Sequence, residues 1–167
     1  MIKRLTWALC LSLALVTATL SAKTIKVPDE DPAVTVNVPE SWNPEQIEKG
    51  ITTESEDKEA TIFFEITEAK DTSEVLDENI KWLKGEKVTI DPATKTEKDF
   101  KAGSMSWSSI SWKGTSEEWG PATIGFAFSD VGHGKVLVMT YWITKKGMAL
   151  HEAELNKIFE SVKKIKG

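Results

Sequence analysis

The stretch from 150 to 164, LHEAELNKIFESVKK, decides the fold class. Apolar side chains recur along it at steps of three and four residues, the spacing of one face of an α-helix: Leu155, Ile158, Phe159, Val162 and Ile165. Glutamates lie near its start and lysines gather at its end, which complements the helix dipole. An apolar stripe this wide has to pack against the face of a β-sheet, so the sequence before the helix is expected to form strands.

Extended segments fill the region just before this helix. We predict strands over 87–90, 95–101, 104–112, 121–129 and 135–144. Between the last two, the glycines of DVGHG (130–134) provide the positive φ that a hairpin turn needs. These segments therefore predict an antiparallel meander.

One of these strands changes its apolar parity. Met105 and Trp107 share one face, whereas Ile110 and Trp112 fall on the other. An extra residue near Ser108 would return all four side chains to the same face, which predicts a β-bulge. The alternative is a sheet that is buried on both faces at this point.

The first half of the domain predicts further strands and one helix. Residues 33–38 alternate strictly until Pro39, 51–53 form a short strand, and 59–67 place Ile62, Phe64 and Ile66 inward. A helix is expected over 72–84. Asp71 is its expected N-cap and Gly85 its expected stop.

This order of elements resembles a known family. The signs are VPESW (38–42) at the end of the first alternating strand and LNKIFESVK (155–163) in the terminal helix, with a hairpin, a helix and a meander between them. The chain resembles the PsbP-like superfamily, which includes photosystem II extrinsic subunits, a Ran-binding import factor and bacterial exported proteins such as DcrB. The resemblance implies an α+β domain with an antiparallel sheet flanked by helices, in an α/β/α sandwich. It also implies a role in binding or assembly, and it carries over no functional residue.

The first 22 residues read as a secretory signal peptide. Two basic residues, Lys3 and Arg4, precede an apolar run over 5–20, and Ser21 and Ala22 follow. Cleavage is expected after Ala18 or after Ala22. Ala18 fits better, because it places Val16 rather than Leu20 three residues before the cut, where a small residue is preferred. An uncleaved anchor is the alternative. The predicted organisation is a signal peptide over 1–22 and one PsbP-like domain over 23–167.

The composition of the chain after signal removal argues against several classes of function. The only Cys and the only Arg are lost with the signal, so the mature domain has no disulfide and no thiol chemistry. With two of the 21 basic residues removed and none of the 26 acidic ones, the net charge is about −7. An acidic surface without Arg disfavours nucleic-acid binding. A periplasmic or secreted protein without a stable membrane span is expected.

Tryptophan is the unusual residue: six of the seven remain after signal removal, against one Tyr. Those on predicted strands, Trp107, Trp112 and Trp142, are expected in the core. Trp119, on a loop, is the best candidate for an exposed aromatic that contacts a partner, and Trp82 is a second candidate at the edge of the first helix's stripe.

The two histidines define a second, polar candidate site. His133 lies in the Gly-flanked turn near Asp130, and His151 precedes Glu154 by three residues, a spacing that can reach one ion on a helix face. Solvated surface residues are the preferred interpretation, and no zinc-protease pattern is present. A meeting of the two histidines in space would strengthen a metal or enzyme hypothesis.

The residues therefore predict a non-enzymatic binding or accessory protein of the bacterial envelope that acts through protein–protein contacts. We assign no catalytic residue, no cofactor and no metal, because none of the usual catalytic signatures occurs. The alternative is a small-molecule or lipid carrier that uses a cleft between the terminal helix and the sheet, with a hydrolase third. The sequence leaves the partner, the ligand and the oligomeric state open.

Overall fold

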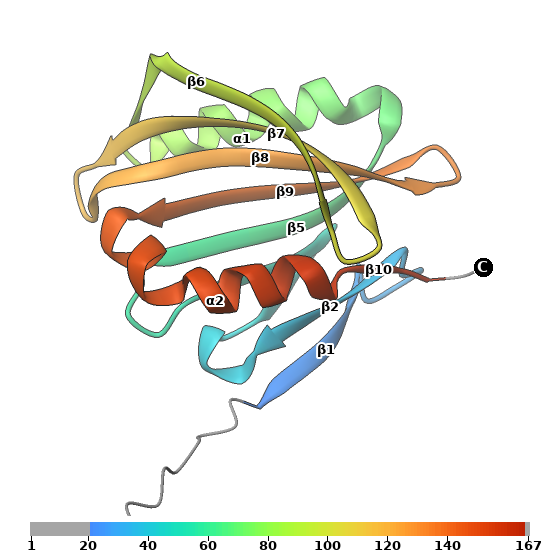
Figure 1. The fold of residues 1–167 in the computed structure, drawn as a ribbon. Helices are drawn as coiled ribbons and strands as arrows, with labels where there is room; N and C mark the ends of the chain where they lie inside the picture. The colour runs from blue at the N-terminus through green and yellow to red at the C-terminus, as the bar shows by residue number, and fades with distance from the viewer. Residues whose placement is uncertain (1–20, 166–167) are drawn as a thin grey trace, which may run out of the picture.

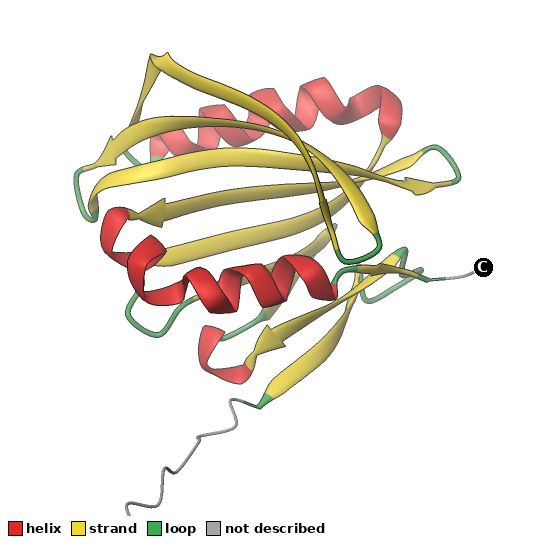
Figure 2. Cartoon of the chain, viewed as in Figure 1, coloured by secondary structure: helices red, strands yellow, loops and turns green. Residues whose placement is uncertain are grey.

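The computed structural model describes residues 21–165, which fold into two antiparallel sheets and two α-helices (Figure 2). Of the predicted signal peptide, only Ser21 and Ala22 belong to this range. Both are exposed, and β1 starts at the second of them.

The large sheet has seven strands in the order β3-β4-β5-β9-β8-β7-β6. Its strands are β3 (Glu45–Ile47), β4 (Gly50–Glu54), β5 (Ala60–Glu68), β6 (Val88–Ala102), β7 (Met105–Ser116), β8 (Gly120–Gly132) and β9 (Lys135–Thr144). All neighbouring strands are antiparallel. The four strands from β6 to β9 are consecutive in sequence, as the predicted meander requires.

A smaller sheet joins both ends of the described chain. It contains β1 (Ala22–Val27), β2 (Val34–Pro39) and β10 (Lys163–Lys164), in the order β1-β2-β10. Of these three strands, the sequence predicted only β2. Its valines Val34, Val36 and Val38 are all fully buried, as their period of two indicates.

The helices lie on opposite faces of the large sheet (Figure 1). α1 (Thr72–Gly85) covers one face, and α2 (Lys145–Ser161) covers the other together with the small sheet; two 3-10 turns, η1 (Glu40–Trp42) and η2 (Ala69–Asp71), complete the fold. The expected α+β sandwich, with an antiparallel sheet between helices, is confirmed.

Each face has its own apolar core. On the α2 face, Phe64 and Met139 of the sheet meet Leu155 and Ile158 of the helix. On the α1 face, Leu83 is fully buried among strand residues that include Phe126 and Trp142. Burial of these side chains from water holds both helices against the sheet.

The terminal helix differs from its prediction at both ends. It starts at Lys145, because the hydroxyl oxygen of Thr144 caps it by accepting a hydrogen bond from Gly147 N at 2.9 Å. It ends at Ser161, and Lys163 and Lys164 form β10 beside β2. These lysines therefore pair with β2 in the small sheet, and they do not lie in the last turn of the helix, where their charge would complement its dipole.

The first helix has the predicted position with different ends. Asp71 occupies the N-cap, but its side chain makes no capping hydrogen bond. The left-handed residue that turns the chain into β6 is Lys87, with φ 57°, rather than Gly85, which is still helical.

The predicted bulge near Ser108 is wrong. β7 pairs with both neighbours through Ser108 without a shift in register. Trp107 packs on Phe159 of α2, and Trp112 packs on Phe126 of the opposite face. The alternative was correct: the sheet buries side chains on both faces here. The irregularity lies in β6 instead, between Asp91 and Thr96, where it joins the two strands predicted over 87–90 and 95–101.

Candidate functional site

Four aromatic side chains meet on the α1 face and form what we call the aromatic cluster: Trp82 of α1, Phe63 of β5, Trp142 of β9 and Trp119 of the β7–β8 turn. The Trp82 ring lies 5.3 Å from Phe63 and 5.4 Å from Trp142, centroid to centroid. Trp119 stacks on Trp142 at 5.8 Å. Each such pair contributes about 0.5–1.5 kcal/mol beyond the area that it buries.

The cluster contains both tryptophans singled out from the sequence, with their exposure reversed. Trp82 is the most exposed of the four, at 39%, whereas Trp119 is half-buried by its stacking on Trp142. Trp142 is buried, and its indole N–H finds no acceptor within residues 21–165. Trp142 comes from a central strand, and nothing in the sequence indicated that it connects Trp82 with Trp119.

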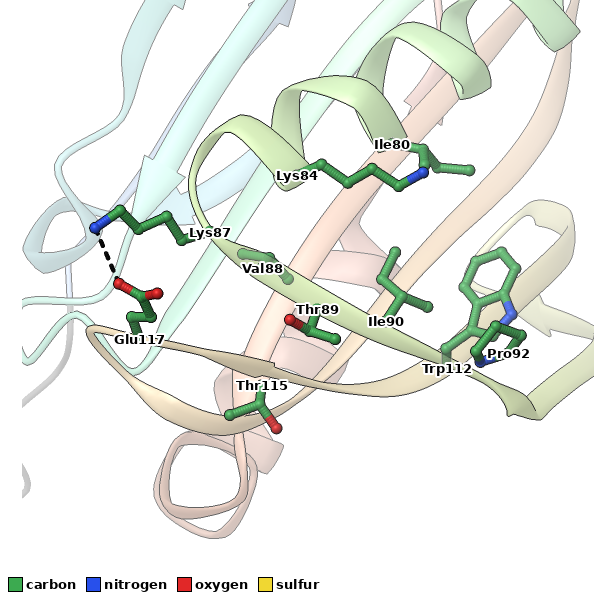
Figure 3. Close-up of a pocket in the computed structure, with 10 residues that line it drawn as sticks. All are labelled: Ile80, Lys84, Lys87, Val88, Thr89, Ile90, Pro92, Trp112, Thr115 and Glu117. Carbon is green, nitrogen blue, oxygen red and sulfur yellow. Dashed lines mark hydrogen bonds and ion pairs between the residues drawn. The ribbon is translucent and has the colours of Figure 1, made fainter.

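A cleft of about 750 Å³ opens beside this cluster, between α1 and the β6–β7 pair (Figure 3). Its lining comes from the end of α1, the first half of β6 and the end of β7 with its turn: Ile80, Lys84, Lys87, Val88, Thr89, Ile90, Pro92, Trp112, Thr115 and Glu117. Neither Trp82 nor Trp119 lines it.

The cleft has an ion pair at one end and apolar side chains at the other, and the Lys84 ammonium group lies beside Ile80, away from the ion pair. Figure 3 shows Lys87 paired with Glu117 at one end, at 2.9 Å, and Trp112 beside Pro92 at the other. Val88 and Ile90 lie between them. The ion pair lies where β6 leaves the turn at Lys87, and the apolar side chains lie where β6 changes its register with β7 after Asp91.

The cleft expected beside the terminal helix is smaller. A space of about 450 Å³ lies between α2 and the β6–β7 pair, with Phe100, Tyr141, Met148 and Phe159 in its lining. Lysine, serine and glutamate side chains also line it. Burial raises the pKa of the Tyr141 hydroxyl, so this side chain is a neutral donor at physiological pH.

His151 lies in a hydrogen-bonded network near the start of α2. Its Nδ1 is 2.9 Å from Glu154 Oε2, and its Nε2 is 3.0 Å from Asp57 Oδ1 in the β4–β5 turn. Trp42 donates its indole N–H to the same glutamate oxygen at 3.0 Å. The spacing of 151 and 154 indicated the first contact, but nothing in the sequence indicated Asp57 or Trp42.

The carboxylates control the charge of this network. Partial burial acts to lower the pKa of His151, but the hydrogen bonds to Glu154 and Asp57 outweigh it and raise that pKa above its ordinary value. Burial acts to raise the pKa of Asp57, and hydrogen bonds from Ser55, His151 and Glu59 N outweigh it and lower that pKa. Within residues 21–165, no group of three or more His, Cys, Asp or Glu side chains is arranged to hold a metal ion.

The other two residues of the polar candidate site lie elsewhere. His133 occupies the β8–β9 turn with φ 55°, and Asp130 accepts a hydrogen bond there from Gly132 N at 2.9 Å. Ten residues of β9 separate this turn from the start of α2. At about 3.3 Å per residue they span roughly 30 Å. The six residues of α2 before His151 bring it back by only about 9 Å, so His133 and His151 do not form one site.

The structure resembles solved structures of low sequence identity. The cyanobacterial PsbP of Synechocystis sp. PCC 6803 aligns with a TM-score of 0.59 and 7% identity, over 90% of this chain and 96% of that chain. LpqN of Mycobacterium tuberculosis, involved in cell envelope biogenesis, aligns with a TM-score of 0.52 and 16% identity, over 87% of this chain and 92% of that chain. The sequence matches no protein-family model and no curated protein.

These neighbours bear out the family resemblance at the level of the fold, and the chain has a PsbP-like fold. At such identities the likeness extends to the fold alone. Neither helix within residues 21–165 has the length and apolar character needed to cross a bilayer.

Proposed function

We propose that this chain is an exported, non-enzymatic accessory protein of the bacterial envelope, which binds a partner protein through the aromatic cluster. The observation that carries the proposal is the position of Trp82. Its indole is 39% exposed while it rests on Phe63 and Trp142. The signal peptide predicted over 1–22 supports export.

An exposed indole held in this way is well suited to anchor a partner. Tryptophan is enriched among the residues that dominate binding energy at protein interfaces. An edge-on contact with Phe63 and a tilted contact with Trp142 hold the Trp82 ring in place before a partner binds. Little side-chain entropy therefore remains to be lost on binding. The half-buried Trp119 extends the aromatic surface through Trp142.

The charges around the cluster indicate the complementary surface. Glu78 and Glu86 are exposed one turn before and one turn after Trp82, and Glu118 is exposed beside Trp119. Lys81 is exposed beside Trp82 as well, so the surface carries both signs of charge and favours a partner with an apolar pocket and a mixed-charge rim. A role in the envelope agrees with that of LpqN, which is involved in cell envelope biogenesis.

Partner capture with a matched pair of variants tests the proposal. Trp82→Ala removes the anchor, and Leu150→Ala removes an exposed apolar side chain, 59% accessible, from the other helix. Cross-linking in the native envelope followed by quantitative mass spectrometry should recover a partner with the wild type and Leu150→Ala. Trp82→Ala should weaken purified binding by a factor of about 30, as expected for an anchor residue.

Circular dichroism and thermal melting of both variants show whether they are folded. Equal recovery of every cross-linked protein by Trp82→Ala and by the wild type would overturn the proposal. Absence of any reproducible cross-linked protein with the wild type would overturn it as well.

A further inference from the structure

The cleft between α1 and β6 is a second feature, separate from the aromatic cluster. We propose that it is a binding site for a single-chain carboxylate amphiphile. The exposed side chains of Lys84 and Lys87, which point away from each other in Figure 3, turn to hold its carboxylate, and the hydrocarbon chain lies along β6 toward Trp112. The proposal does not depend on the proposed partner surface, because Trp82 and Trp119 do not line the cleft.

The volume and the apolar lining favour a small organic ligand. At about 750 Å³ the cleft falls within the range of about 300–1,000 Å³ that is usual for such sites. Val88 is buried at its base, while Ile80, Ile90 and Trp112 are half-buried and border it. A ligand chain would bring these partly exposed surfaces out of water.

The arrangement of this lining favours a linear ligand. The apolar side chains follow β6 from Val88 through Ile90 to Pro92 and Trp112, instead of surrounding a compact centre (Figure 3). An unbranched chain can contact each of them in turn. Pro92 has no N–H, so this part of β6 offers one backbone donor fewer to a competing polar ligand.

The charges at the rim determine the head group. Lys84, Lys87 and Glu117 are the charged residues of the lining, which gives the lining itself one net positive charge. Glu86 and Glu118 adjoin its Lys87 end, so Lys84 is the group that favours an anionic head group. Lys84 has no ion-pair partner among residues 21–165, and Figure 3 shows its side chain running along the mouth of the cleft toward Ile80.

Lys87 offers a second ammonium group that the ligand can recruit. Its partner Glu117 is exposed, with 71% of its side chain accessible, so this ion pair is weak. A ligand carboxylate can take the place of Glu117 at little cost. A cationic head group beside Lys84 would be repelled by an ammonium group that has no ion-pair partner among residues 21–165, and is disfavoured.

Titration of the purified protein with sodium laurate, below its micelle-forming concentration, tests the proposal by calorimetry and tryptophan fluorescence. Laurate is expected to bind, and octanoate more weakly by about fourfold for each CH₂ removed. Dodecyltrimethylammonium, with the same chain and a positive head group, is expected to bind at least tenfold more weakly than laurate.

Three variants locate the site. The double variant Lys84→Gln/Lys87→Gln is expected to weaken laurate binding at least tenfold, because Glu117 is then left unpaired at the rim. Lys81→Gln, on an exposed α1 residue outside the lining, should bind like the wild type. Trp112→Phe should remove the fluorescence change that laurate causes.

Three results would overturn the proposal: no laurate binding, equal binding of laurate and the cationic amphiphile, or equal binding by the double variant and Lys81→Gln. None of these results bears on the aromatic cluster, since Trp82 is unchanged throughout. Conversely, loss of partner capture in Trp82→Ala leaves the laurate titration unaffected.

Discussion

Trp42 donates its indole N–H to Glu154 Oε2 at 3.0 Å and so ties the turn after β2 to α2. The indole is almost fully buried, at 1% exposure, and its ring meets the His151 ring edge-on at 5.4 Å. His151 in turn reaches Asp57. Three segments that are distant in sequence therefore meet through one titratable side chain, and the stability of this junction depends on pH.

We predict that thermal stability falls as the pH rises through neutrality. The folded-state pKa of His151 is raised, so its contribution is full below the unfolded value of about 6.5 and is lost as the pH rises through the folded pKa. The pKa of Asp57 is lowered, so its contribution is present above about 4 and is lost as the pH falls through the folded pKa. Together the two residues stabilise the fold most between about pH 4 and about pH 6.5.

The measurement is the Tm of the wild type and of His151→Gln at about pH 5.5 and about pH 8, on either side of the ordinary histidine pKa. A partly solvated pair contributes up to about 1 kcal/mol, so the wild type should lose about 1–3 °C more than the variant. Lys146 and Glu59 also lie near Asp57, but both proteins share them. An identical pH response of the two proteins would contradict the prediction.

A second prediction concerns the close approach of α2 to Glu59, the residue just before β5. A Cβ at Gly147 would lie 2.4 Å from the backbone oxygen of Glu59, and neither backbone can move freely. Gly147→Ala is therefore expected to destabilise the fold by about 1–3 kcal/mol, although alanine is the better helix former.

Gly85→Ala is the matched control for this substitution. Gly85 is also helical, but a Cβ there would meet nothing within 4 Å. This variant should be neutral or more stable by up to about 1 kcal/mol. Urea unfolding of both variants measures their free energies of unfolding. Equal values would contradict the prediction, because they would show that the clash with Glu59 does not destabilise the fold.

Local periodicity predicted much of this fold, because side-chain alternation reports which face is buried. The strand over 135–144 coincides with β9, and the helix over 72–84 is one residue short of α1. The parity change between Trp107 and Trp112 was open to two interpretations, because alternation in one strand does not show whether one face or both are covered. The position of α2 on one face and α1 on the other decided it.

The candidate site was less accessible to sequence reasoning because its contacts are long-range. Trp82 and Trp119 meet only through Trp142, which a sequence reading assigns to the core. Asp57 lies in a turn that reads as a solvated acidic segment, 94 residues before His151. Pairings of this kind depend on strand order, and β1 and β10, which frame the small sheet, carry too little alternating pattern to be recognised.

A third prediction is that the signal is cleaved after Ala18 rather than after Ala22. Ala22 is the first residue of β1 and pairs with Pro39, and Glu40 N donates to the Ser21 carbonyl at 3.0 Å. Cleavage after Ala22 would remove Ser21 and Ala22, and with them this strand pairing and this hydrogen bond. Cleavage after Ala18 keeps both residues and places Val16, rather than Leu20, three residues before the cut.

N-terminal sequencing of the exported protein should therefore begin at Thr19. Ala18→Gln should accumulate the uncleaved precursor, because the residue before the cut must be small. Ala22→Gln is the matched control: Ala22 is exposed, so the larger side chain should leave both cleavage and folding intact. Processing that is blocked by Ala22→Gln and not by Ala18→Gln would move the site to Ala22. In that case β1 would begin at Lys23, and the hydrogen bond from Glu40 N to the Ser21 carbonyl would be lost.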